Sequence, residues 1–371
     1  MVEFTVGPVT GDYADWGTAW DYLVGLGALA DDYNFRQVEN CVINNSWNQF
    51  SVVDCNGHSV RFYVPEAARH GGNPNAGLVT NLVGVNGVIN MQFTNTTIAD
   101  NVYVDGLNVQ KTDFSAIVMM LFGSFAANTE INFNITNNIL KGFSTGEGTG
   151  IKFRNNMCLP KVSNLKIFHI RTPFDGVFSV ALLVDRPDTH YAENVVVDDF
   201  GLFGFSVSNL PGVSQGHEWT FKNCVAVGGN GNPAANPTGW LNPGAGPTRI
   251  KAFNCADTDG SLSTAVWIDR TDCISNIVAA DEFASLVDTD NDYLFLKLGA
   301  VTADWTREPA GNVNVGDVIK FDPEVTITPG ATVLHNSGIA PTLQSVDITG
   351  QAIPNSQGEY PIGAHIQEYS T

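Results

Sequence analysis

The polar residues best suited to acid–base chemistry gather between positions 169 and 190. A polyuronate lyase needs a base that removes a proton next to a carboxylate, and a cation that neutralises that carboxylate. Arg171, Asp175 and Arg186 would supply such groups if the fold brings them to one face, so they are the candidate catalytic residues of an enzyme. Arginine beside several aspartates is more often a solvated ion pair on a loop, which is the interpretation we prefer. The same stretch also holds His169, Asp185, Asp188 and His190.

A second set of acidic residues has the spacing of paired carboxylates. Hydrolysis of a neutral glycan needs two carboxyl groups about 5 to 9 Å apart. Asp257 and Asp259 would share one face of a strand, and Asp198 and Asp199 fall near an equivalent corner on a nearby repeat. Because aspartate is a common turn former and these positions fall at predicted turns, we interpret them as turn residues.

Asp288, Asp290 and Asp292 alternate in the way that the first ligands of calcium loops do. Tyr293 replaces the glycine expected at the sixth position of such a loop, and Gly299 stands where the glutamate should be. The segment is therefore either a divergent calcium site or an acidic linker. No other cofactor is predicted, because the 7 histidines form no HxxxH or HExxH motif and the glycine-rich run at 229–234 contains proline instead of leading into a helix.

These candidate residues lie within a repeating pattern of short strand-like runs. In each repeat an asparagine is followed by an apolar residue, and many repeats contain a second strand-like run, such as 150–153 and 203–207. The repeats recur at intervals of roughly 20 to 30 residues and show almost no helical periodicity. The asparagines are Asn40, Asn138, Asn164, Asn194, Asn223, Asn254 and Asn276, with Gly87 and Gly106 as variants.

This pattern predicts an all-β fold, a parallel β-helix (solenoid). Asparagine tolerates the left-handed backbone conformation of a tight corner, and asparagines stacked about 4.8 Å apart on successive coils can hydrogen-bond to one another. The apolar residue after each asparagine should point into the core, where Cys224 and Cys255 would stack. Since the 6 cysteines lie far apart without a CxxC pair, we expect buried free thiols rather than a zinc site or a disulfide framework.

Three regions are expected along the chain. Residues 1–40 form an N-terminal cap and the segment that leads into the solenoid, and a short amphipathic helix within 11–23 places Trp16, Trp20 and Leu23 on one face over the first coil. Residues 41–290 form the parallel β-helix. Residues 291–371 form a C-terminal β-rich cap or small domain, with strand-like runs at 318–321 and 325–328.

The charge of the chain limits its partners. It carries 18 basic and 38 acidic residues, which gives a formal net charge of -20. Such a surface repels nucleic acid and anionic membranes, so neither is an expected partner. The first residues lack the basic and apolar regions of a secretion signal, and the apolar run near 114–127 is too short to span a bilayer, so we expect a soluble protein made in a cytoplasm.

The sequence resembles known β-helix proteins along much of its length. Residues 10–23 resemble the opening segment of right-handed parallel β-helix proteins of the pectate-lyase-like superfamily. Residues 60–72 and 101–107 are similar to a subgroup encoded by tailed bacteriophages and environmental bacteria. Residues 346–351 and 360–365 resemble the sequence that closes such helices. The resemblance implies a right-handed parallel β-helix, but the fold does not choose among the lyases, hydrolases, epimerases and virion proteins that share it.

The resemblance implies a structural protein of a tailed-phage virion, exposed as a spike, fibre or capsid-decorating subunit. Such a protein would assemble in the host cytoplasm, leave by lysis, contact other virion proteins and host surface polysaccharide, and form a homo-oligomer, a trimer by resemblance. The alternative is a carbohydrate-active enzyme, a polysaccharide lyase or glycoside hydrolase depolymerase, with Arg171, Asp175 and Arg186 on the β-helix flank. A third alternative is a glycan-binding module that uses exposed aromatic side chains such as Trp219 or Trp240.

Overall fold

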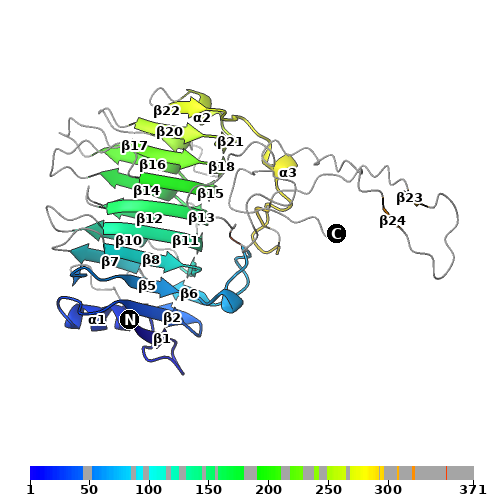
Figure 1. The fold of residues 1–371 in the computed structure, drawn as a ribbon. Helices are drawn as coiled ribbons and strands as arrows, with labels where there is room; N and C mark the ends of the chain where they lie inside the picture. Colours follow the sequence, from blue (N-terminus) through cyan, green and yellow to red (C-terminus); the bar gives the residue numbers. More distant parts are fainter. Residues whose placement is uncertain are drawn as a thin grey trace, which may run out of the picture.

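The computed structural model shows a chain wound into a parallel β-solenoid (Figure 1). Within the described residues, the two large sheets are built from parallel strand pairs, which confirms the predicted fold class. The described residues are 1–44, 52–84, 89–94, 100–113, 118–124, 131–143, 148–154, 158–178, 190–209, 218–228, 238–241, 249–264, 268–291, 293–295, 307–308, 320–321 and 348.

The larger sheet stacks strands from successive coils in sequence order, from β1 to β22. Pairing is in register over long stretches, as between β11 and β13, where Ile131 pairs with Cys158 and Lys141 with Phe168. The strands are β1 (Val2–Val6), β2 (Tyr33–Gln37), β5 (Val60–Tyr63), β8 (Asp100–Asp105), β11 (Ile131–Lys141), β13 (Cys158–Ile170), β15 (His190–Phe200), β17 (Glu218–Lys222), β20 (Arg249–Phe253) and β22 (Ile268–Thr271).

Three of these strands, β11, β13 and β15, are long because they continue past a corner, and their second halves pair with one another. Beyond them in the stack, the short strand β9 pairs with the second half of β11, and the short strand β18 pairs with that of β15. The short strands of this part of the sheet are β3 (Cys41–Ile43), β6 (Val79–Leu82), β9 (Asn108–Lys111), β18 (Val225–Val227) and β21 (Ala256–Asp257), and β3 pairs with β6, β6 with β9, and β21 with β18. The second sheet contains β4 (Val53–Asp54), β7 (Ile89–Thr94), β10 (Val118–Ser124), β12 (Thr149–Arg154), β14 (Thr172–Phe178), β16 (Phe203–Asn209) and β19 (Thr238–Leu241).

A column of asparagines forms the corner. Asn137, Asn164, Asn194 and Asn223 stack in register with φ between 52° and 57°, the left-handed conformation that asparagine tolerates. The side-chain amides of Asn164, Asn194 and Asn223 each donate to the amide oxygen of the asparagine one coil earlier, at 3.0, 3.1 and 3.2 Å. Asn137, the first of the column, donates to Asp105 Oδ1 at 3.0 Å. The predicted asparagine ladder is therefore confirmed for these coils.

The first ladder asparagine is Asn137 and not Asn138, so the predicted position was wrong by one residue. Asn138 points into the interior, where its Oδ1 accepts a 2.8 Å hydrogen bond from the Leu107 amide and its Nδ2 donates to the Val104 carbonyl at 3.1 Å. The amide is buried with its own partners, so a polar residue occupies a place where an apolar one was expected.

The ends of this column depart from asparagine. Gly106 precedes Asn137 with φ 78°, and a Cβ on it would lie 2.6 Å from Arg69 Nε, so glycine is required there for both conformation and space. At the other end Asp272, with φ 52°, follows Asn254 in register. Asn276, which the sequence pattern suggested, lies further along the chain.

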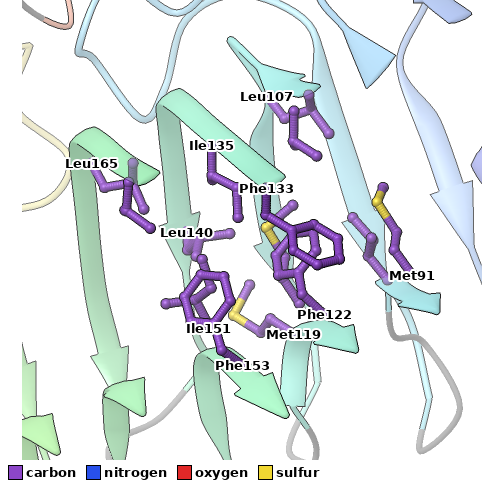
Figure 2. Packing of buried hydrophobic residues seen from close by; sticks show 14 of the residues in the cluster. Met91, Leu107, Met119, Phe122, Phe133, Ile135, Leu140, Ile151, Phe153 and Leu165 are labelled. Atoms are coloured by element: carbon purple, nitrogen blue, oxygen red, sulfur yellow. The ribbon is translucent and has the colours of Figure 1, made fainter. Parts of the chain in front are cut away.

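Apolar side chains from successive coils stack inside the solenoid (Figure 2). The Phe122 ring lies 5.3 Å from Phe133 and stacks on Phe153 at 5.5 Å, measured between ring centroids. Burial of each such ring contributes about 1.5–3 kcal/mol to stability. Cys224 and Cys255 belong to this interior as buried free thiols, as predicted.

The expected N-terminal helix is α1 (Trp16–Gly25). The Asp15 side chain caps the helix by accepting a 2.8 Å hydrogen bond from the Thr18 backbone amide. The Thr18 hydroxyl accepts a bond from the Asp15 backbone amide at 3.2 Å, which completes a capping box. Trp16 and Trp20 are buried, with ring centroids 5.7 Å from Phe62 and 5.2 Å from Phe93, respectively. The helix thus closes the interior of the first coils.

The remaining elements are short: η1 (Glu66–Ala68), α2 (Ser261–Thr264), α3 (Ala279–Glu282), and an antiparallel pair of β23 (Arg307–Glu308) and β24 (Lys320–Phe321). The predicted run at 325–328 lies outside the described residues, and the division at 290/291 stays a prediction. None of the helices in the described part of the chain combines the length and the apolar character that a membrane crossing requires.

Candidate functional site

The outer face of the larger sheet carries an apolar patch that the chain covers itself. We call the cover the strap: residues 277–295, of which all but 292 are described. It packs on side chains that alternate with the core positions of β11, β13, β15, β18 and β21. In Figure 1 the yellow segment with α3 descends beside the strands toward η1. The patch on the sheet consists of Ile139, Phe168, Val196, Val225, Val227 and Ala256. The strap contributes Ile277, Phe283, Tyr293 and Leu294, and Ile348 belongs to the same cluster.

A buried lysine fastens the strap. Lys166 on β13 is fully buried, and its Nζ donates to the backbone carbonyl of Gly72 at 3.0 Å and to that of Tyr293 at 2.9 Å. The same ammonium lies 3.8 Å from the centre of the Phe295 ring. A buried ammonium is stable only with partners of this kind, so Lys166 ties β13, the loop after η1 and the strap together.

The loop after η1 also bonds directly to the strap. Asn73 Nδ2 donates to Asn291 Oδ1 at 2.9 Å, and Asn75 Nδ2 donates to the backbone carbonyl of Asp288 at 2.9 Å. These bonds join residues more than 200 positions apart in sequence. The strap therefore reaches from the last coils back to one of the first.

An ionic cluster lies under the strap at the second corner of the coils. His169 bonds through Nδ1 to Asp199 Oδ2, and its Nε2 lies 3.4 Å from Asp288 Oδ2. Lys141 forms an ion pair with the same Asp288 carboxylate. The four side chains are 21 to 27% exposed, so they are partly shielded from solvent. His169 and Asp199 both have positive φ, 57° and 43°, which turns them out of the strand at the corner.

The charges in this cluster decide what His169 can do. Burial alone would lower the pKa of His169, but the hydrogen bond and charge of Asp199 and the charge of Asp288 raise it overall. Burial would raise the pKa of Asp288, but Lys141 and His169 hold it below its usual range. An imidazolium whose two ring nitrogens both face carboxylates has no free site to accept a proton. The cluster thus has the chemistry of an ionic latch and not of a general base.

Asp198, beside Asp199, has a separate partner on the strap. The Tyr293 hydroxyl donates to Asp198 Oδ2 at 2.6 Å, and both side chains are buried. Burial raises the pKa of Asp198 to about 6, and burial together with the Asp198 charge raises the pKa of Tyr293 well above its usual range. The two adjacent aspartates therefore bond in different directions, one to the strap tyrosine and one to His169.

Of the three predicted catalytic residues, only Arg171 has a side chain among the described residues. Arg171 is exposed at the turn after β13, where its carbonyl accepts a 2.8 Å bond from the Leu202 amide. Asp175 lies on β14 opposite Lys152, its side chain is outside the described residues, and so is all of Arg186. Their candidacy stays a prediction.

Asp257 and Asp259 shape a turn, as their sequence positions suggested. Asp257 is fully buried, and its Oδ1 accepts from the amides of Gly260 at 3.1 Å and Asn276 at 3.2 Å. Asp259 accepts a 2.7 Å bond from the Ser261 hydroxyl. Both carboxylates thus organise the turn into α2.

The three aspartates of the suggested calcium loop have other partners where they are described. Asp288 belongs to the ionic cluster, and Asp290 accepts a 2.6 Å bond from the Ser285 hydroxyl. Asp292 lies outside the described residues, so the calcium site stays a prediction. Among the residues that the structure describes, no group of three or more His, Cys, Asp and Glu side chains is arranged to hold a metal ion.

The expectation that Trp219 and Trp240 are exposed is wrong. Trp219 is 0% and Trp240 1% exposed, because both occupy inward-facing positions of β17 and β19. Trp219 stacks on Phe221 with ring centroids 5.6 Å apart, and Trp240 stacks on Phe205 at 4.3 Å. These tryptophans therefore belong to the core and cannot bind a glycan.

Arg69 anchors the loop after η1. Arg69 Nη2 lies 2.6 Å from Asp105 Oδ2, and its Nε donates to the Val64 carbonyl at 2.9 Å. His70 is buried, and its Nε2 lies 2.8 Å from the Asn137 carbonyl. Burial lowers the pKa of His70 to about 4, so it is neutral at ordinary pH. This loop is the one that meets the strap at Gly72, Asn73 and Asn75.

Sequence reasoning missed the strap and its lysine. One signal was present: Val195, Val196 and Val197 are consecutive apolar residues in a strand, a pattern typical of burial on both faces. It indicates that something covers the outer face, but it does not identify the covering segment.

The fold places the chain among parallel β-solenoid proteins. No protein-family model matches its sequence, and no curated protein sequence matches it either. Among solved structures, the chain is similar to the pectin methylesterase from Aspergillus niger, with 12% identity, a TM-score of 0.36, and coverage of 77% of this chain and 88% of that chain. A likeness at this level is informative about neither activity nor substrate.

Proposed function

We propose that this chain is a structural protein of a tailed-phage particle, exposed as a spike, fibre or capsid-decorating subunit. The observation that carries the proposal is the strap, which lies on the outer face of the long sheet and is held there by Lys166, His169 and Asp198. A small-molecule or catalytic site is concave and lined by polar groups that converge on a ligand. Here the polar groups converge on one another, which favours a rigid rod over an open groove.

The ionic cluster supports the same proposal. A catalytic histidine needs one ring nitrogen that is free to exchange a proton with substrate. His169 faces Asp199 through one nitrogen and Asp288 through the other, and Asp288 is also paired with Lys141. The four groups hold a segment of chain in place, which is a mechanical role.

The phage particle enters the proposal through the resemblance of residues 60–72 and 101–107 to phage-encoded β-helices. In this proposal the protein assembles with other particle proteins in the host cytoplasm, is released by lysis as a homo-oligomer, a trimer, and meets host surface polysaccharide. Loops and corners, not the strap-covered face, would make those contacts.

Mass spectrometry of particles purified from cultures of the source tests the proposal. Peptides of this chain should stay in a fixed ratio to the major capsid protein through a second density gradient, and gold-labelled antibodies should mark one place on the particle. Recovery of the protein only in the non-sedimenting fraction would contradict the proposal.

A carbohydrate-active enzyme is the second candidate, and the exposure of Arg171 at the turn into β14 favours it. Arg171 and Asp175 would then act on a polysaccharide at the flank of the solenoid. A reducing-end assay against capsule of the host tests this candidate: oligosaccharide release that Arg171→Ala and Asp175→Ala abolish, and that the exposed Asp269→Ala retains, would establish it over the structural role. No release by the wild-type protein would exclude it for that capsule.

A further inference from the structure

Three thiols stack at the far end of the solenoid. Cys224, Cys255 and Cys273 take the same position in successive coils, because Val225 pairs with Ala256 and Ala256 with Ile274. All three are free; the first two are buried and Cys273 is partly exposed. The Cys255 thiol donates to backbone carbonyls, to that of Phe221 at 3.6 Å and that of Phe253 at 3.5 Å. Nothing in the structural role described above requires three adjacent thiols.

The spacing of this column suits a covalent bond between neighbours. In-register residues of adjacent parallel strands lie about 4.8 Å apart, inside the range of roughly 4.4–6.8 Å that disulfide Cα atoms occupy. The Cβ atoms of a disulfide lie closer, at about 3.5–4.5 Å, so one coil must move by less than about 1 Å. The bond therefore needs a coil that is free to shift.

The coil of Cys273 is the one that can shift. Its strand β22 ends the larger sheet, with β20 as its only strand partner among the described residues, whereas β18, beside Cys224, is paired on both sides by β15 and β21. Cys273 is also the most accessible of the three thiols. Both features favour a disulfide between Cys255 and Cys273 over one between Cys224 and Cys255.

We infer that Cys255 and Cys273 form a disulfide when the protein meets an oxidising small-molecule disulfide, and that this bond staples the last described coil to the coil before it. The Cys273 thiolate attacks the small disulfide, forms a mixed disulfide and releases one small thiol. The Cys255 thiolate then attacks the Cys273 sulfur and expels the second small thiol. One small disulfide is reduced, two protein thiols are oxidised, and the two protons leave with the small thiols.

The reaction should be slow and should speed up as pH rises. Burial raises the pKa of the Cys255 thiol well above its usual range, and the neighbouring Cys255 thiol together with burial raises the pKa of Cys273. The thiolate is the attacking species, so few molecules react at neutral pH. The bond also fixes the root of the strap, because Ile274 follows Cys273 directly and pairs with Ala256.

The test treats the full-length protein with 2-hydroxyethyl disulfide at pH 8.5, followed by alkylation in denaturant and mass spectrometry. Before alkylation the intact mass should fall by about 2 Da. After alkylation the oxidised protein should carry labels on four of its 6 thiols, and one cross-linked peptide should join Cys255 to Cys273. Amide exchange in β22 should then slow by at least about tenfold, and dithiothreitol should reverse this effect.

Variants separate this bond from other thiol chemistry. Cys273→Ser, at the partly exposed position, should keep all its remaining thiols, while Cys41→Ser, in an early coil, should still form the bond. A stable small-molecule adduct on Cys273 without the cross-link, a cross-link between any other pair, or unchanged exchange in β22 after oxidation would each overturn the inference.

Discussion

The hydroxyl of Tyr293 and the carboxylate of Asp198 are joined by a 2.6 Å hydrogen bond that links the strap to the outer face of β15. The bond is buried, and it lies beside the ionic cluster that holds the same strap. The attachment of the strap therefore depends on groups whose charge changes with pH, and most of the predictions below concern that dependence.

Removal of the tyrosine hydroxyl should loosen the strap. Tyr293→Phe leaves a buried carboxylate without its donor, which costs about 1–3 kcal/mol. Hydrogen exchange of the strap amides should accelerate accordingly at pH 8. The pKa of Asp198 is about 6 in the wild type, and removal of the hydroxyl that lowers it should raise it further. Asp198 is therefore neutral in both proteins at pH 5, and the effect of the substitution should be smaller at that pH. Tyr103→Phe, at an exposed position, is the matched control and should leave strap exchange unchanged.

Asp198 should make the protein less stable as pH rises through about 6. The pKa of Asp198 in the fold is about 6 against an ordinary value of 3.8, so the fold favours the neutral carboxyl. The favourable contribution is complete below about pH 4 and is lost as pH rises through about 6, a change of roughly 3 kcal/mol. Asp198→Asn keeps an acceptor for Tyr293 and removes the charge. In denaturant titrations, the free energy of unfolding of the variant relative to wild type should rise by this amount between pH 4 and pH 8. Parallel curves of unfolding free energy against pH for the two proteins would contradict the assignment.

His169 should act in the same direction at higher pH. Its pKa is raised above 6.5, so the stability from its ion pairs is fully present below pH 6.5 and is lost as pH rises through the folded value. His169→Asn tolerates the left-handed backbone and removes the charge, and it should cost about 0.5–1 kcal/mol at pH 6 and little at pH 9. An NMR titration of the imidazole protons checks the cause, since a midpoint at or below 6.5 is inconsistent with the two facing carboxylates.

The asparagine ladder should contribute through both backbone conformation and hydrogen bonds. Asn194 donates to Asn164 and accepts from Asn223, and its φ is 55°. Asn194→Gly loses the two bonds, at about 0.5–1.5 kcal/mol each, and Asn194→Ala adds about 1–2 kcal/mol of strain from the left-handed conformation. Equilibrium unfolding should therefore rank the proteins wild type, glycine variant, alanine variant, and equal losses for the two variants would refute the conformational part.

The coiled architecture was predictable from sequence because each coil repeats the same local requirements. A corner needs a residue that accepts positive φ, and the next position needs a core side chain. Asn164, Asn194 and Asn223, each followed by an apolar residue, meet both requirements and predict three successive coils. Trp16 and Trp20 predict the N-terminal cap in the same way, because their spacing places both on one face of a helix. These signals are local and need no knowledge of distant chain.

The strap was not predictable because its contacts are distant in sequence. In the sequence, Lys166 has the pattern of an ordinary solvent-facing lysine in a strand. Only the fold shows that its ammonium binds the backbone carbonyls of Gly72 and Tyr293. The exposure predicted for Trp219 failed for a related reason: the inward or outward direction of a strand residue depends on register, and a one-residue change reverses it.

The span of the strap changes how the solenoid should unfold. A stack of coils in which each touches only its neighbours can fray from either end, one repeat at a time. Here Asn291 bonds to Asn73 near the start of the chain, while Ile277 packs near its last coils. Loss of any coil between these two attachment points removes part of the surface that holds the strap, so the coils between them should melt in a single all-or-none event. The strap can also dock only after those coils exist, which makes its attachment the final step of assembly.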